Sequence, residues 1–186
     1  MKSGFGPGAS WTVSDIETVW VEYWQSLSST DLPHENDHDR VNDTLALMVD
    51  PDPDNNHDHA PSVTCIPTKV TASGTSSLTT FFQTTYFPTG PPSQHLRLLT
   101  RTTGSDRIVD EILFSFAHTE EIPWLLPGVK PTNRDVRIRL VLTGEFFAGK
   151  LATQNVYWDQ ASVLVQVGLL DPSLVPGYSR DQVLDY

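Results

Sequence analysis

The sequence lacks the features that mark several common classes of protein. It has one cysteine, Cys65, so neither a disulfide framework nor a cysteine-based zinc site can form within one chain. Lys and Arg number 12 against 23 Asp and Glu, and the net charge of −11 argues against nucleic acid and membranes as partners, because both need a basic face. No stretch has the apolar length of a membrane span or of a signal peptide. We therefore expect a cytoplasmic protein.

Length and composition favour one domain with irregular extensions. A chain of 186 residues can bury a sizeable core, while 14 prolines and a hydrophobic fraction of 38% indicate that part of it forms loops. The Gly-rich residues 1–10 are expected to be disordered. One domain is predicted over 11–170, with an exposed acidic loop at 50–61, and residues 171–186 form a C-terminal extension.

Four histidines lie among aspartates, asparagines and prolines between residues 31 and 61. This composition is typical of a solvated loop, which cannot bury enough apolar surface to order itself. We therefore predict that these histidines bind no metal. They are His34, His38, His57 and His59.

The first half of the chain has helical patterns. Ser14 and Glu17 have the spacing of a capping box, which starts a helix by pairing its first free amides. Apolar residues at helical spacing then predict an amphipathic helix with an aromatic buried face. They are Ile16, Val19, Trp20, Tyr23, Trp24 and Leu27. Further helices are predicted around 39–48 and over 76–87.

The second half has the patterns of an antiparallel sheet. After a short strand at 63–70, strands are predicted over 96–103, 107–118, 136–147 and 150–158. In the strand 107–118, alternate apolar residues share one face of the sheet. They are Ile108, Ile112, Phe114 and Phe116. Helices followed by a meander of strands indicate an α+β domain with its helices on one face.

A single acid, Asp159, stands where the last strand passes into the apolar segment 161–170. A carboxylate at such a junction must be solvated, paired or ready to accept a proton, because burying it unpaired is costly. Burial would raise its pKa and make it a useful acid or base near neutral pH. The alternative is that Asp159 caps the following helix by accepting an amide such as that of Ser162. Both roles can hold, and both stay open.

The same region resembles the SnoaL-like polyketide cyclases of the nuclear transport factor 2-like superfamily. Gly149-Lys150, Tyr157-Trp158-Asp159 and Gln166-Val167-Gly168 resemble the end of those chains. Pro131-Thr132-Asn133-Arg134 resembles their Pro-Thr-Gly-Lys/Arg loop, and Asn133 tolerates the positive φ that a glycine would supply. Fungal members with Tyr-Trp-Asp-Gln-Ala-Ser-Val-Leu look closer still. Many are named dienelactone hydrolases, but this chain has no Gly-x-Ser-x-Gly nucleophile elbow.

The resemblance implies a cone: a bent mixed sheet wrapped around N-terminal helices, with one deep apolar pocket. It implies an isomerase or cyclase that acts on an oxygenated polyketide or terpenoid intermediate without a cofactor, with Asp159 as general acid/base. Gln154 stands where the fungal group often has Glu, which puts acid/base chemistry in doubt. One alternative is a pericyclic, Diels–Alder-type cyclase that works by shape and hydrogen bonding. The other is a non-catalytic module for ligand binding or dimerisation.

Two further residues are candidates for the catalytic site. Tyr157 shares strand parity with Asn155 and Asp159, which would put a hydroxyl, an amide and a carboxylate on one face, although an ordinary half-polar sheet face has the same pattern. His118 ends a long strand and is either a partner of Asp159 that titrates near neutral pH or a surface histidine.

The remaining candidates are predicted to contact the substrate. They are Trp24, Asp110, Phe114, Phe116, Trp124, Arg139 and Asn155. Among them, Arg139 is expected to pair with Asp159 or Glu145 across the final hairpin. Trp124 and Trp158 form either an aromatic wall or part of the core, and core packing is favoured for Trp158.

An apolar face of the strand 136–147 predicts a homodimer. Ile138, Leu140 and Leu142 share one face, and we assign either these residues or their neighbours to the convex side of the sheet. Exposed apolar faces of that size rarely stay unpaired, so we expect a second copy of the chain to cover it.

Overall fold

The computed structural model describes residues 12–28, 37–49 and 60–177 of the chain. Its strands are β1 (Ser62–Cys65), β2 (Val70–Ser73), β3 (His95–Thr103), β4 (Arg107–Ala117), β5 (Asp135–Phe147) and β6 (Lys150–Trp158). Its helices are α1 (Val13–Ser28), α2 (Asp37–Ala46), α3 (Thr75–Phe81) and α4 (Gln160–Gln166), with short turns η2 (Phe82–Tyr86), η3 (Phe87–Thr89) and η4 (Pro172–Leu174). The predicted disordered N-terminus and all but the end of the acidic loop lie outside the described residues.

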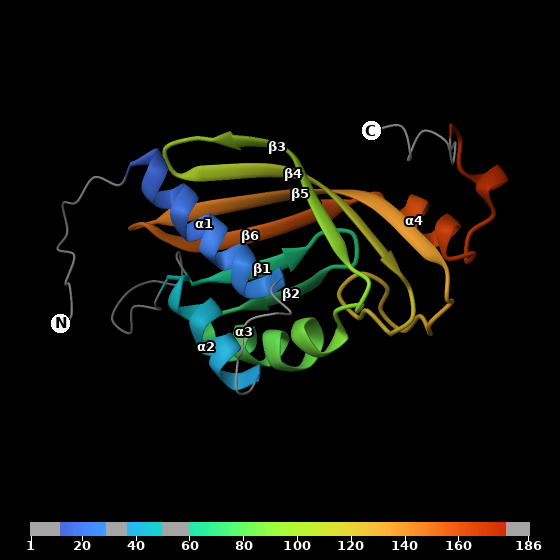
Figure 1. The fold of residues 1–186 in the computed structure, drawn as a ribbon, viewed down its shortest axis with the longest axis horizontal. Helices are drawn as coiled ribbons and strands as arrows, with labels where there is room; N and C mark the ends of the chain where they lie inside the picture. The colour runs from blue at the N-terminus through green and yellow to red at the C-terminus, as the bar shows by residue number, and fades with distance from the viewer. Residues whose placement is uncertain (1–11, 29–36, 50–59, 178–186) are drawn as a thin grey trace.

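The strands form one six-stranded sheet in the order β2-β1-β6-β5-β4-β3. Neighbours are antiparallel except β1 and β6, which are parallel, so the sheet is mixed as predicted. Register shifts between β3 and β4 and between β5 and β6 help to bend it. The helices α1, α2 and α3 lie together beside the sheet, while α4 and the segment after it lie at its other end (Figure 1). The predicted α+β cone is confirmed.

Helix α1 starts one half-turn before the predicted position. Thr12 and Asp15 form the capping pair: the Thr12 amide donates to Asp15 Oδ2 at 2.8 Å, and the Asp15 amide donates to Thr12 Oγ1 at 3.3 Å. The prediction that Ser14 and Glu17 form the capping box was wrong. Both residue pairs have the spacing of a capping box, and only the position at which the helix starts decides between them. Glu17 instead accepts a hydrogen bond from Thr103 on β3 at 2.5 Å.

The helix predicted over 76–87 is present but irregular. After α3 the backbone widens into the π turn η2 and then narrows into the 3-10 turn η3, where Pro88 supplies no amide hydrogen. This change of pitch lets four aromatic side chains face one cavity. They are Phe81, Phe82, Tyr86 and Phe87.

The inner, concave face of the sheet forms much of the core. Ile108, Ile112, Phe114 and Phe116 are all buried, as the alternation predicts. Ile138, Leu140 and Leu142 pair with Phe114, Ile112 and Asp110 and are buried on the same inner face. Their assignment to the convex side was wrong, because alternation separates two faces without saying which one the helices cover. The homodimer stays a prediction, now without this apolar face as its basis.

The turns follow the backbone requirements of their residues. Asn133 has φ of 56°, so the predicted replacement of glycine by asparagine at a left-handed position is confirmed. Ala148 and Gly149, with φ of 49° and 76°, form the tight turn between β5 and β6. The single strand predicted at 63–70 is instead the hairpin of β1 and β2, since Pro67 falls in its turn.

Candidate functional site

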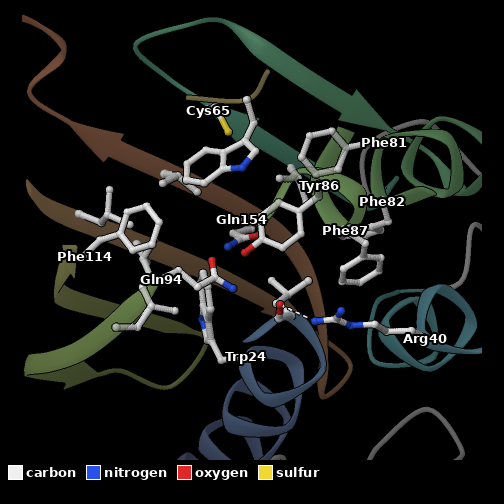
Figure 2. Close-up of a pocket in the computed structure, with 18 residues that line it drawn as sticks. Trp24, Arg40, Cys65, Phe81, Phe82, Tyr86, Phe87, Gln94, Phe114 and Gln154 are labelled. Carbon is white, nitrogen blue, oxygen red and sulfur yellow. Dashed lines mark hydrogen bonds between the residues drawn. The ribbon is translucent and has the colours of Figure 1, made fainter. Parts of the chain in front are cut away.

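One cavity of about 80 Å³ lies between the helices and the inner face of the sheet (Figure 2). Its wall is made by side chains of α1, α2, α3, η2 and η3 and of every strand except β2, together with loop residues. The lining residues are Trp24, Leu27, Arg40, Val63, Cys65, Phe81, Phe82, Tyr86, Phe87, Gly90, Gln94, Leu96, Phe114, Trp124, Leu140, Leu142, Gln154 and Val156. Aromatic and aliphatic side chains dominate this set, which is typical of sites for small organic ligands.

An aromatic wall forms one side of this pocket. The ring of Trp124 lies 5.9 Å from that of Tyr86 and 6.1 Å from that of Phe114, measured between centroids. Trp124 and Phe114, both predicted to contact the substrate, therefore line the same pocket. Trp158 meets Trp124 edge-on at 5.9 Å but does not line the pocket, and its indole donates to Gln160 Oε1 at 2.5 Å, which agrees with core packing.

The polar groups of the pocket are mostly neutral. Gln154 is 2% exposed, and its Oε1 accepts a hydrogen bond from the fully buried Tyr23 hydroxyl at 2.5 Å. Burial raises the pKa of the Tyr23 and Tyr86 hydroxyls and raises the pKa of the Cys65 thiol to about 12. At neutral pH these groups carry their protons, so they can donate hydrogen bonds but are poor bases.

Two other side chains of the wall come from helices. Arg40 of α2 donates from Nε to the Ser26 carbonyl and from Nη2 to the Leu27 carbonyl, both at 2.8 Å, and its guanidinium lies 4.1 Å from the ring centroid of Phe87. It thereby satisfies carbonyls at the end of α1. Trp24 of α1 has a buried indole nitrogen with no hydrogen-bond partner among the described residues.

The predicted catalytic set does not lie in this pocket. Asp159 is exposed and its Oδ1 accepts the Ser162 amide at 3.2 Å, so it caps α4. Tyr157 is 39% exposed and pairs with Val141, while Asn155 pairs with Thr143. This parity of β6 faces outward, and Gln154 and Val156 of the opposite parity face the pocket. The structure therefore shows the capping alternative for Asp159 and puts Tyr157 and Asn155 on the outer face of the sheet.

His118 is fully buried, so its interpretation as a surface histidine was wrong. Its Nδ1 lies 3.1 Å from Thr132 Oγ1, and its Nε2 is buried without a partner among the described residues. Burial lowers the pKa of the imidazole, which favours the neutral ring. Neither His118 nor Phe116 lines the pocket. The Phe116 ring packs against the lining residue Phe114, with the two ring centroids 4.9 Å apart.

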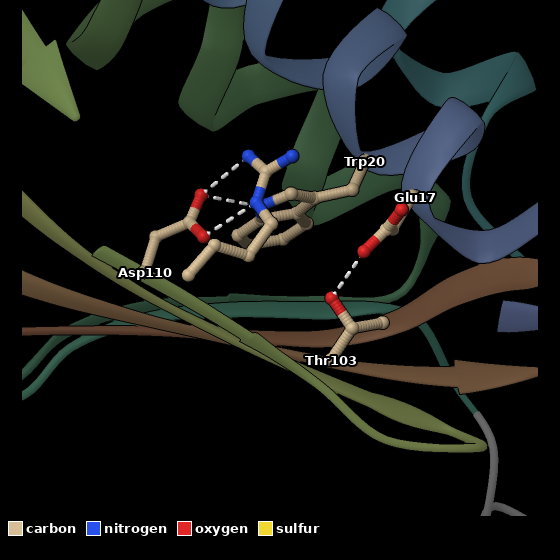
Figure 3. A network of polar contacts seen from close by, with 5 residues as sticks. Glu17, Trp20, Thr103 and Asp110 are labelled. Carbon is tan, nitrogen blue, oxygen red and sulfur yellow. Dashed lines mark hydrogen bonds and ion pairs between the residues drawn. The ribbon is translucent and has the colours of Figure 1, made fainter. Parts of the chain in front are cut away.

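Asp110 belongs to a separate polar network on the same inner face of the sheet (Figure 3). It is 1% exposed, and it accepts hydrogen bonds from Arg101 Nε at 2.7 Å, Arg101 Nη2 at 2.8 Å and Trp20 Nε1 at 2.7 Å. The network ties α1 to β3 and β4 and does not reach the pocket lining. Arg139, on the outer face, pairs with Glu111 at 3.4 Å, whereas Glu145 pairs with Arg107.

Metal binding and membrane insertion find no support within the described residues. Across 12–28, 37–49 and 60–177, no three His, Cys, Asp or Glu side chains are grouped as a metal site requires. His34, His57 and His59 lie outside those ranges, and the side chain of His38 is not described. In the same ranges no helix is long and apolar enough to cross a membrane.

Sequence reasoning missed the polar residues that face the pocket. Gln154 carried the clearest signal, an uncharged side chain where related chains are expected to have Glu, but the parity of β6 was assigned to the other face. Tyr23 was identified only as a core aromatic, and Tyr86 only as part of a helix. Tyr86 lines the pocket and Tyr23 holds Gln154 by a hydrogen bond, because α1 and η2 both lie over the same face of the sheet. Such contacts between distant segments leave no local pattern.

The comparisons with known proteins identify the fold. No family model matches the sequence, and no curated protein is similar to it. A SnoaL-like polyketide cyclase homologue from Jannaschia has a TM-score of 0.62 at 13% identity, covering 90% of this chain and 100% of that one. A protein from Catenulispora acidiphila with a ketosteroid isomerase-like fold, bound to trimethylamine, has a TM-score of 0.54 at 11% identity over 82% and 93%.

A third neighbour is SalBIII, an epoxide hydrolase/cyclase-like enzyme with a role in pyran ring formation in the polyether salinomycin. It has a TM-score of 0.53 at 10% identity, covering 80% of this chain and 94% of that one. Identities this low are informative about architecture and not about activity. The chain therefore has the fold of SnoaL-like polyketide cyclases and ketosteroid isomerase-like proteins.

Proposed function

We propose that this protein is a cofactor-independent cyclase of oxygenated natural-product intermediates, which works by shape and hydrogen bonding. The observation that carries the proposal is the make-up of the pocket: its walls are aromatic, and its described lining contains no Asp, Glu or His. The fold neighbours include a SnoaL-like cyclase homologue and a cyclase-like enzyme, which supports the reaction class.

Neutral donors suit a reaction that moves no proton to or from the protein. Gln154 can donate a hydrogen bond from its amide nitrogen, since its oxygen already accepts one from the Tyr23 hydroxyl. The Tyr86 hydroxyl and the Cys65 thiol keep their protons, because burial raises the pKa of each. Such donors polarise a carbonyl, and the rigid aromatic wall holds a flexible chain with its reacting carbons together.

The step itself is an intramolecular cycloaddition of a conjugated diene and an enone on one chain. Two carbon–carbon σ bonds form at the expense of two π bonds, no atom is lost, and no oxidant or reductant is needed. A carbonyl hydrogen-bonded to the pocket makes the enone a better acceptor. The proposal does not use Asp159, whose side chain is exposed and caps α4.

The test is a panel of linear diene–enones that cyclise slowly on their own, analysed for rate and stereoisomer ratio by chromatography. We expect the protein to accelerate at least one member and to bias its stereochemistry. Trp124→Ala removes the centre of the aromatic wall and should lower the rate about tenfold or more. Asp159→Asn keeps the cap, because Asn caps about as well as Asp, and should leave the rate unchanged.

Two results would contradict the proposal. Loss of activity in Asp159→Asn would return the mechanism to acid/base catalysis. Binding of the panel without any acceleration would make the protein a non-catalytic ligand-binding module. That second candidate is favoured by the same observation, the scarcity of ionisable groups in the pocket wall.

A further inference from the structure

We infer that the indole N–H of Trp24 is the hydrogen-bond donor that selects the ligand of this pocket, and that the ligand is a largely apolar molecule with a carbonyl or ether oxygen. The inference rests on the proposed function in giving the pocket a small organic ligand. It goes further in naming the selecting residue and the chemical group that it recognises. It does not depend on whether the pocket also catalyses a reaction.

The inference comes from a comparison of two tryptophans that lie one helical turn apart on α1. Trp20 and Trp24 pack edge-on with ring centroids 5.7 Å apart, so both lie against the inner side of the fold. The Trp20 indole donates to Asp110 at 2.7 Å. The Trp24 indole nitrogen is equally buried and has no partner among the described residues, yet its side chain lines the pocket.

A buried donor without a partner costs about 1 to 3 kcal/mol, and most native structures avoid it. A Trp at this position is therefore informative, since Phe would fill similar space without that cost. A ligand oxygen in the pocket would restore the missing hydrogen bond. Because the nitrogen is covered, a neighbouring side chain has to move first, and Gln94, a half-buried loop residue of the same lining, is the flexible candidate.

The surroundings define the rest of the ligand. Aromatic rings of Phe114, Trp124 and Tyr86 face the same cavity and favour a flat or cyclic apolar body. The guanidinium of Arg40 already donates to the carbonyls at the end of α1 and lies against the Phe87 ring. These contacts do not favour a carboxylate on the ligand. An acceptor oxygen on an apolar frame fits these groups best.

The experiment uses two probes of the same shape. Acetophenone and α-methylstyrene differ only in a carbonyl oxygen against a CH₂ group, so their affinities for two proteins form a thermodynamic cycle. Ligand-observed NMR titration measures both dissociation constants for the unaltered protein and for Trp24→Phe. We expect Trp24→Phe to weaken acetophenone about threefold to tenfold more than it weakens α-methylstyrene, which is the net value of one hydrogen bond.

Phe114→Leu is the matched control, because it changes the shape of the pocket without touching a polar atom. It should weaken both probes by the same factor. If Trp24→Phe does not fold, replacing Trp24 by 3-benzothienylalanine keeps the shape and puts sulfur in place of N–H. Equal losses for the two probes, or no binding of acetophenone to the unaltered protein, would overturn the inference. Selective binding without any cyclisation would preserve it and refute only the proposed catalysis.

Discussion

The inner face of the sheet carries two polar clusters that differ in how completely they are paired. In the first, Asp110 accepts three hydrogen bonds from Arg101 and Trp20, and no buried polar atom of these three side chains lacks a partner. In the second, Gln154 of the pocket is joined to Tyr23 by one hydrogen bond, and the Trp24 nitrogen has no partner among the described residues. The paired cluster contains charges, whereas the groups of the pocket are mostly neutral.

This difference indicates that the paired cluster stabilises the fold, whereas the incompletely paired cluster is suited to binding a ligand. A buried ion pair is tolerated when its hydrogen bonds are complete, and a complete network holds elements in one arrangement. An incomplete polar set in a cavity costs stability, and a ligand that completes its hydrogen bonds would recover that cost. The side chains around Asp110 are also tightly packed. A Cβ on Gly144 would approach Trp20 Cζ3 to 2.6 Å, so only glycine at this position lets the indole lie on β5.

The largest effect is expected from Asp110→Asn, which breaks the paired cluster. Arg101 would keep its charge beside a neutral amide, and the free energy of unfolding should fall by about 3 kcal/mol in urea titrations. Glu145→Gln is the control, since it removes an exposed ion pair with Arg107 on the outer face and should cost about 0.5 kcal/mol or less. Equal losses in the two variants would contradict this, because the network would then add no more stability than an exposed ion pair.

A smaller effect is expected from Gln154→Leu in the pocket cluster. The Tyr23 hydroxyl would stay buried without its partner, at a cost of about 2 kcal/mol. Adding Tyr23→Phe removes the stranded hydroxyl, so the double variant should recover most of that loss in the same urea titrations. A double variant that is less stable than Gln154→Leu would contradict the assignment of this hydrogen bond.

The smallest effect concerns His118, at the end of the strand that holds Asp110. Burial puts its folded-state pKa below its ordinary value of about 6.5, so the unfolded chain binds the proton more readily. The stability that depends on the neutral ring is therefore complete above pH 6.5 and falls as the pH drops below it. The free energy of unfolding should decline less between pH 7 and pH 5 in His118→Asn; parallel pH profiles would contradict this.

Much of the architecture could be predicted from the sequence, because strong local patterns carry it. The aromatic stripe of α1 and the alternation in β4 determined those elements. The left-handed turn at Asn133 followed from the resemblance to a family loop with glycine there, because Asn also tolerates positive φ. The role of Asp159 was narrowed to two alternatives, of which its cap is now visible. Among the pocket residues, Trp24, Phe114 and Trp124 were identified because large aromatics are informative on any inward face.

The tertiary structure alone decided which faces meet. A strand's alternation defines two faces equally well, so only the packing of α1 and η2 shows that Gln154 points inward and Tyr157 outward. The pairing of Asp110 with Arg101 and Trp20 joins three elements, and no local pattern encodes it. The sequence by itself determined the elements and an aromatic interior, since both follow from periodicity. The fold determined the site, since a site is made of contacts between residues far apart in the chain.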